Sequence, residues 1–154
     1  MKRIPLKGEQ LGTLAHMLRR VDFFSPLTVG DMDQVLPYIM SETFAPGENI
    51  FAQGEPGDAF YIVETGKVEV WLKRGFFSFS KMVAQLGPGD IFGEMALIST
   101  DPRNATVTCA EATKLFVLVA ADFQFVLKKN PQTAAEMQRI AERRKFRDAH
   151  LTNQ

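Results

Sequence analysis

The residues best suited to chemistry lie close together, in the stretch GPGDIFGEMALISTDPRNAT at residues 87–106. Gly93 lets the backbone approach a ligand closely, and residues 94–97 are good helix formers whose first amides would have no partner within a helix. The Asp101-Pro102 pair should end that helix after little more than a turn, because proline restricts the residue before it. The chain after this turn should place Arg103 beside the same amides, and the planar guanidinium of Arg103 suits the oxygens of a phosphate. The spacing therefore predicts an anion site.

The composition is that of an ordinary globular domain. The chain has 154 residues, of which 45% are hydrophobic and 23% charged, enough for one domain with its own core. Lysine plus arginine and aspartate plus glutamate are equal at 18 each, so any surface for nucleic acid or an anionic membrane must be local. The single cysteine, Cys109, excludes an internal disulfide, and no apolar run reaches the ~18 residues of a membrane span. We therefore expect a cytoplasmic chain with no membrane insertion.

Two helices are predicted in the first part of the chain. Apolar residues recur at helical spacing over residues 9–23, which indicates an amphipathic helix. Thr28, followed three residues later by Asp31, resembles a capping box, so a second helix is expected near residues 29–40. Pro37 should kink or shorten that helix.

Short strands dominate the middle of the chain. Eight of the eleven glycines fall in residues 47–93, between short runs typical of strands. Period-two alternation over residues 67–72 and turns spaced every eight to twelve residues or so favour a barrel or a sandwich. Two further runs, at 105–110 and 114–119, bring the expected total to about seven or eight antiparallel strands.

Helical spacing returns after the last strand. It begins near Ala121, and Asn130-Pro131 then starts a final helix that should run to about Arg147. The apolar stripe of this helix is narrow, which suits it to lie over another part of the molecule.

Four further residues are interpreted as packing residues. Phe76, Phe77 and Phe79 sit beside a predicted strand end, and their alternation favours core packing over an exposed docking patch. Cys109 alternates within a strand and is predicted to be an inert buried thiol.

The stretch FGEMAL at residues 92–97, followed by PRNATV at residues 102–107, resembles the phosphate-binding cassette of cyclic-nucleotide-binding domains. These domains occur in catabolite activator proteins, kinase regulatory subunits and nucleotide-gated channels. The runs FAPGE at 44–48, QGEPGD at 53–58 and YIVETGKV at 61–68 are similar to the family's early strands and turns. The resemblance covers about residues 20–147, and ADFQ at 121–124 together with the ending ERR at 142–144 is most similar to bacterial cyclic-nucleotide-regulated potassium channels.

This resemblance implies a single α+β domain over residues 1–154. Its centre would be an eight-stranded antiparallel β-roll, a jelly-roll-like barrel, at residues 44–119, with the phosphate-binding cassette and its short helix at 87–107. N-terminal helices at 1–43 would flank the roll, and C-terminal lid helices at 120–148 would close over bound ligand.

The resemblance also implies residue roles. Arg103 would pair with the cyclic phosphate, Glu94 would accept a hydrogen bond from the ribose 2′-hydroxyl, and backbone amides would complete the cradle. On the last helix, either Gln138 or Arg139 would contact the base. The candidate ligand-binding residues are Phe92, Gly93, Glu94, Met95, Ala96, Arg103, Asn104, Ala105, Thr106, Gln138 and Arg139.

The expected function is that of a regulatory sensor which binds cAMP in preference to cGMP and signals to an unknown downstream protein in trans. Asn104 stands where relatives commonly have alanine or threonine, so the sequence leaves the choice of base open. A homodimer through the N-terminal or C-terminal helices is also considered. The alternative is a protein-interaction module of the same fold, with nucleotide absent or only structural.

Other function classes are disfavoured. No nucleophile and base stand at a defensible spacing, and His16 and His150 are isolated, so we expect neither an enzyme nor a metal or cofactor site. The basic residues of the last helix raise the question of DNA binding. Only about seven residues follow Arg147, too few for a helix-turn-helix, so no DNA partner is expected.

Overall fold

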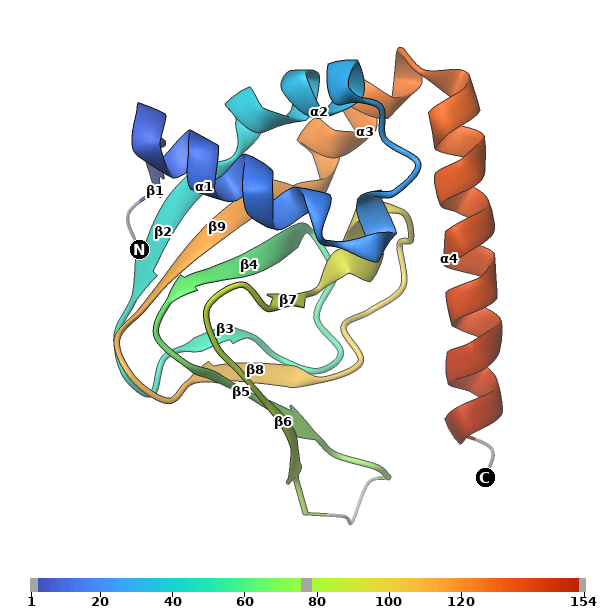
Figure 1. Cartoon of the computed structure of the whole chain (residues 1–154). Coiled ribbons are helices and arrows are strands. Elements are labelled where there is room, and N and C mark those ends of the chain that lie inside the picture. Colours follow the sequence, from blue (N-terminus) through green and yellow to red (C-terminus); the bar gives the residue numbers. More distant parts are fainter. Residues whose placement is uncertain (1–2, 76–78, 153–154) are drawn as a thin grey trace.

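Two antiparallel sheets form the body of the protein, in a computed structural model that describes residues 3–75 and 79–152 (Figure 1). The first sheet contains, in spatial order, β1 (Arg3–Pro5), β2 (Met40–Phe44), β9 (Thr113–Val119), β4 (Ala59–Thr65) and β7 (Ile91–Phe92). The second contains β3 (Asn49–Phe51), β8 (Thr106–Cys109), β5 (Val68–Leu72) and β6 (Lys81–Leu86). The predicted antiparallel roll is confirmed, with nine strands in the described residues instead of eight.

The central strands β4 and β9 are buried on both faces. Successive side chains of a strand point to opposite faces. Phe60 of β4 and Phe116 of β9 accordingly pack in the core beneath the helices, whereas their neighbours Tyr61 and Val117 pack in a second core between the sheets. This explains why the run at residues 60–63 is apolar throughout instead of alternating.

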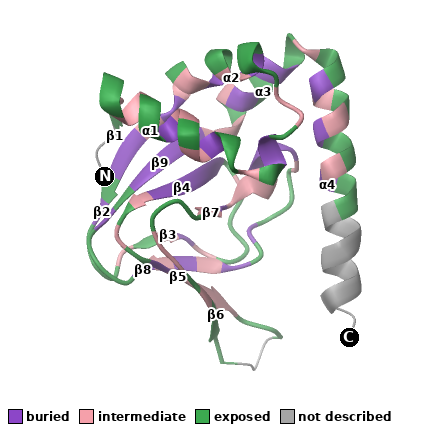
Figure 2. Cartoon of the chain, in the orientation of Figure 1, coloured by how far each residue is buried: buried purple, intermediate pink, exposed green. Residues whose placement is uncertain are grey.

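Helices cover the outer face of the first sheet. They are α1 (Gly8–Arg19), η1 (Asp22–Phe24), α2 (Val29–Val35), η2 (Leu36–Tyr38), η3 (Glu94–Leu97), α3 (Ala120–Lys128) and α4 (Pro131–Thr152), where η marks a 3₁₀ turn. Figure 2 shows the buried positions of α1 and α3 turned towards this sheet, while α4 runs along the side of the roll. α4 continues past the expected end near Arg147. None of the described helices combines the length and apolar character that crossing a membrane would need.

The sequence-based reading of the first 43 residues needs two corrections. The second helix does not reach residue 40: α2 ends at Val35, the turn around Pro37 is 3₁₀, and Met40 already belongs to β2. Residues 3–5 form β1, which pairs with β2. Both errors come from pairing between segments distant in the sequence, because β1 pairs with β2, and β2 pairs with β9 about seventy residues away, and no local pattern predicts such pairing.

Two packing predictions had opposite outcomes. Cys109 is buried at 1% exposure, as expected, and burial raises the pKa of its thiol. Phe79, in contrast, is 93% exposed, so its assignment to the core was wrong. The alternation that suggested a buried face stops at the end of the hairpin ladder, where Leu72 pairs with Lys81, and Phe79 lies beyond that pair. Phe76 and Phe77 lie outside the described residues.

Candidate functional site

A pocket of about 440 Å³ opens beside η3, within the size range of small-ligand sites. Its lining residues are Phe51, Gly57, Val70, Phe92, Gly93, Glu94, Met95, Ala96, Asp101, Pro102, Arg103, Asn104, Ala105 and Val107. The fold thus brings eight of the eleven candidate residues to one cavity. Arg103 and Ala105 are buried there, and Glu94 is half-buried.

Gly93 shapes the start of the short turn in the cassette. It adopts φ of 76°, the left-handed region that glycine enters without steric cost, and leads into η3. Within that turn the Ala96 amide donates to the Gly93 carbonyl oxygen at 3.2 Å, so the Glu94 and Met95 amides precede the first bond of the turn. The predicted short helix is therefore confirmed as a 3₁₀ turn whose leading amides border the pocket.

Protein groups hold the Arg103 guanidinium from several sides. Nη2 donates to the Ala59 carbonyl oxygen at 2.8 Å and to Asp58 Oδ1 at 3.4 Å, and Nη1 donates to the Gly93 carbonyl oxygen at 3.5 Å. The ring of Phe51 lies 4.0 Å from the guanidinium carbon, a cation–π contact. These contacts leave the side chain only 5% exposed, so its orientation is set before any ligand binds.

One hydrogen-bond donor of Arg103 is left unsatisfied in the part of the chain that the structure describes. Its Nε–H is buried and has no hydrogen-bond partner among the described residues. Burial lowers the pKa of the guanidinium, against the opposing effect of Asp58, but arginine stays charged in proteins. Asp58 neutralises little of that charge, because its own side chain is 82% exposed. A buried cation with an unsatisfied donor at a pocket fits an anionic ligand with acceptor oxygens.

The connection between β3 and β4 fixes the backbone of Arg103. The Gly54 amide donates to the Arg103 carbonyl oxygen at 2.8 Å, and the Arg103 amide donates to the Glu55 carbonyl oxygen at 2.7 Å. Gly57, to which the sequence gave no role, lines the pocket, and a Cβ there would stand 3.1 Å from that of Ala96. Sequence reasoning missed these supports, as well as Phe51, because they lie some fifty residues before Arg103. The only signal was the resemblance of residues 53–58 to the family.

Three of the predicted residues are not brought to the pocket. The hydroxyl of Thr106 accepts from the Gln53 amide at 2.9 Å and so braces the neighbouring connection. Gln138 is exposed on α4, and Arg139 borders a different hollow beside Ser25 and Pro26. α4 instead packs through Met137 and Ala141, both fully buried in the core beneath the helices.

The family model of the cyclic nucleotide-binding domain matches residues 41–130, which include the pocket and its supports. The chain belongs to the cyclic-nucleotide-binding domain family. The matched domain is a regulatory module and not a catalytic one.

Relatives of this cyclic-nucleotide-binding domain occur in larger proteins. The chain is 34% identical over 125 residues to a cyclic nucleotide-gated potassium channel of Mesorhizobium japonicum, covering 81% of this chain and 33% of the channel. It is 32% identical over 128 residues to the cyclic AMP receptor protein of Thermus thermophilus, covering 83% of this chain and 58% of the receptor. Among solved structures, the regulatory domain of Toxoplasma gondii PKA with cAMP superposes with a TM-score of 0.69 at 27% identity, covering 87% of this chain and 51% of that chain. The chain spans less than two thirds of each of these three proteins.

The cassette of this domain is tied directly to the C-terminal helices. The Gln124 side chain of α3 donates from Nε2 to the carbonyl oxygen of Leu97, the last residue of η3. Leu97 is fully buried in the core shared by η3, α3 and the N-terminal helices. A displacement of η3 would therefore be transmitted to α3 without an intervening loop.

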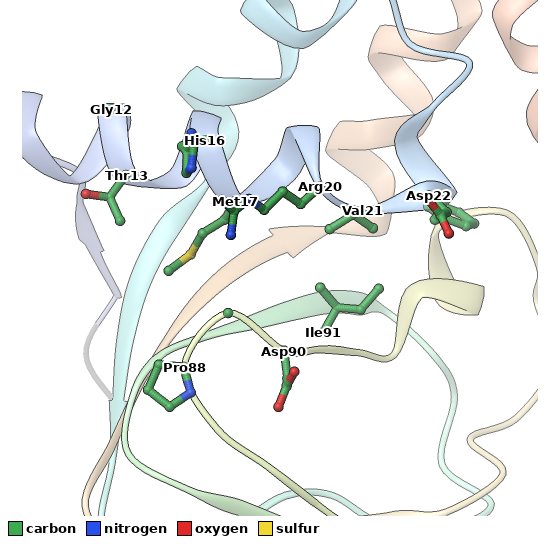
Figure 3. A pocket seen from close by; sticks show the side chains of 12 residues that line it. Gly12, Thr13, His16, Met17, Arg20, Val21, Asp22, Pro88, Asp90 and Ile91 are labelled. Carbon is green, nitrogen blue, oxygen red and sulfur yellow. The ribbon is translucent and has the colours of Figure 1, made fainter.

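A second and larger pocket, of about 950 Å³, lies between α1 and the turn before β7 (Figure 3). Its floor includes Val21 and Ile91, and its rim carries both Arg20 and Asp90. Ile91 faces this pocket, whereas the next residue, Phe92, lines the pocket beside η3, so β7 separates the two. The second pocket is exposed and carries charges of both signs, with no convergent polar group that selects a ligand.

Proposed function

We propose that this chain is a sensor module that binds a 3′,5′-cyclic nucleotide in the pocket beside η3. The observation that carries the proposal is Arg103, a buried and preorganised cation that lines a pocket of ligand size and whose Nε–H has no partner among the described residues. A cyclic phosphate bears one negative charge and acceptor oxygens, which match one guanidinium. A ligand there would also meet the first amides of η3.

The remaining roles follow from the lining of the pocket. Glu94 is half-buried beside the leading amides of η3, so its carboxylate is proposed to accept from the ribose 2′-hydroxyl. The amides of Glu94, Met95 and Ala105 are proposed to donate to the phosphate. Phe92, Ala96 and Asn104 would line the rest of the ligand's surface.

We favour cAMP over cGMP. The names of two of the similar proteins mention cAMP, which supports the preference for cAMP. Asn104 is exposed at the pocket and carries both a donor and an acceptor, so it suits either base.

The output would run through helices to a downstream protein. Gln124 links η3 to α3, and α3 packs against α4, so the C-terminal helices are placed to respond to the ligand. We propose that the module acts in the cytoplasm and signals to its partner in trans. Dimerisation through the N-terminal or C-terminal helices stays a prediction.

Calorimetric titrations with cAMP and with cGMP test this function directly. The parent chain should bind both nucleotides, cAMP more tightly. Arg103→Ala should weaken binding by roughly 10- to 100-fold, because charged hydrogen bonds contribute about 1.5–3 kcal/mol each. Arg19→Ala, which removes an exposed arginine remote from the pocket, is the matched control. Absence of binding to either nucleotide at millimolar concentration, with the chain folded, would refute the proposal.

A further inference from the structure

The hairpin formed by β5 and β6 projects away from the roll (Figure 1). The last pair of its ladder is Leu72 with Lys81, and of the residues between them the structure describes 73–75, 79 and 80. The start of this segment is well anchored: Gln53 accepts from the Lys73 amide and donates to the Lys73 carbonyl oxygen, both at 2.9 Å. The backbone of Lys73 is therefore held in a defined position relative to the roll.

Large apolar side chains are exposed at this end of the hairpin. Phe79 is 93% exposed, Val83 54% and Met82 44%. A β-bulge interrupts the ladder here: Val70 pairs with Ala84 and Trp71 pairs with Met82, so Val83 has no residue opposite it and the regular alternation of faces is broken. Three exposed apolar side chains thus lie within five residues, at or just before the start of β6.

The same segment is locally basic. Residues 70–89 contain three cations, Lys73, Arg74 and Lys81, and no carboxylate, in a chain whose total charge is zero. All three cations are exposed. We call the six described residues the hairpin tip: Lys73, Arg74, Phe79, Lys81, Met82 and Val83.

We propose that the hairpin tip docks on a lipid bilayer that contains anionic phospholipids. Phe79 would enter the boundary between headgroups and acyl chains, and the three cations would meet the phosphates around it. Three exposed apolar side chains within five residues, next to three exposed cations, suit this boundary region of a bilayer. A nucleic acid is the weaker match, because bases stack on flat aromatic faces, whereas Met82 and Val83 are aliphatic. The proposed docking is peripheral: the hairpin tip would enter only the surface of the bilayer, whereas the sequence argued against a segment that spans it.

Sedimentation with vesicles tests the proposal. The parent chain should bind phosphatidylcholine vesicles that contain about 30% phosphatidylserine, bind pure phosphatidylcholine weakly, and lose binding as salt is raised. Phe79→Ser should weaken binding by about ten-fold, since it removes the inserted ring. Converting Lys73, Arg74 and Lys81 together to glutamine should weaken it by on the order of 100-fold, at about five-fold per cation.

Two control variants distinguish binding through the hairpin tip from nonspecific binding of the protein to vesicles. Phe125→Ser removes another aromatic side chain, 51% exposed on α3. Converting the exposed Arg19, Lys114 and Lys128 to glutamine removes the same total charge elsewhere. Both controls should bind vesicles like the parent. Failure of the parent to bind anionic vesicles, or equal losses in the controls, would overturn the proposal. So would binding to single-stranded oligothymidylate in place of vesicles.

Discussion

Gly93 and Arg103 are in such close contact that the backbone of one limits the position of the other. A Cβ at Gly93 would stand 2.8 Å from Nη1 of Arg103 and 3.2 Å from the Ala59 carbonyl oxygen that this guanidinium also contacts. The backbone at Gly93 has φ of 76°, where any other residue is strained. The glycine is therefore required both by the turn and by the arginine beside it.

Gly93→Ala should consequently weaken both folding and ligand binding. The strained φ alone should lower the free energy of unfolding by about 1–2 kcal/mol, and the displaced guanidinium should reduce cAMP affinity by at least about ten-fold. Urea titration and calorimetry measure the two effects. Gly12→Ala is the control, because a Cβ there meets nothing within 4 Å, and it should stabilise α1 by about 0.5–1 kcal/mol. Unchanged cAMP affinity in Gly93→Ala would contradict this account.

At the residue scale, the sequence predicts which neighbouring residues could bind an anion, but it does not predict the contacts that residues distant in the sequence make with them. Gly93, Glu94 and Arg103 lie within eleven residues, so their type and spacing already predicted an anion site. Phe51 and the Ala59 carbonyl reach Arg103 only because β3 and β4 fold against the cassette, and no spacing rule reports that contact. The base-contacting role given to Gln138 or Arg139 depends on where α4 packs, and the structure places neither at the pocket.

At the level of elements, one carboxylate joins α2 to α4. Asp31 Oδ2 accepts from the Thr28 amide at 3.0 Å, which completes the predicted capping box, and from the Thr133 hydroxyl at 2.9 Å. Both Asp31 and Thr133 are buried. The capping box was visible in the sequence, but its link to a residue 102 positions away was not. The same limit hid β2, whose partner β9 lies far along the chain.

Removal of the Thr133 hydroxyl tests this link. Thr133→Val keeps the shape of the side chain but leaves Asp31 with one donor fewer, so the free energy of unfolding should fall by about 1–2 kcal/mol. Hydrogen exchange should also show reduced protection in the first turn of α4. Thr13→Val is the control, because that exposed hydroxyl donates to the Glu9 carbonyl oxygen of its own helix and links no other described element. Equal stability of Thr133→Val and the parent would show that the contact contributes nothing net.

At the scale of the whole molecule, the ligand pocket and the packing site of α4 lie on different sides of the cassette. The pocket belongs to the core between the sheets, through Phe51, Phe92 and Val107. α4 is docked through Met137 in the core beneath the helices. A ligand that touched only the cassette could act on the C-terminal helices through the link from η3 to α3, in which Gln124 supplies one hydrogen bond. To shift an equilibrium from 1:99 to 99:1, a ligand must favour one state by about 5.5 kcal/mol. Contacts from α4 are therefore needed for a strong switch.

We accordingly predict that α4 changes its position when cAMP binds. Spin labels at Lys73→Cys and Glu142→Cys would report it: Lys73 has its backbone anchored by Gln53, and Glu142 is exposed on α4 next to the buried Ala141. Cys109 should not interfere, because it is buried and its raised pKa lowers the fraction of reactive thiolate. Saturating cAMP should shift the distance distribution between the labels, and Arg103→Ala in the same background should require correspondingly more ligand. An unchanged distribution at full occupancy would mean that α4 is not a lid and that the output leaves through the N-terminal helices.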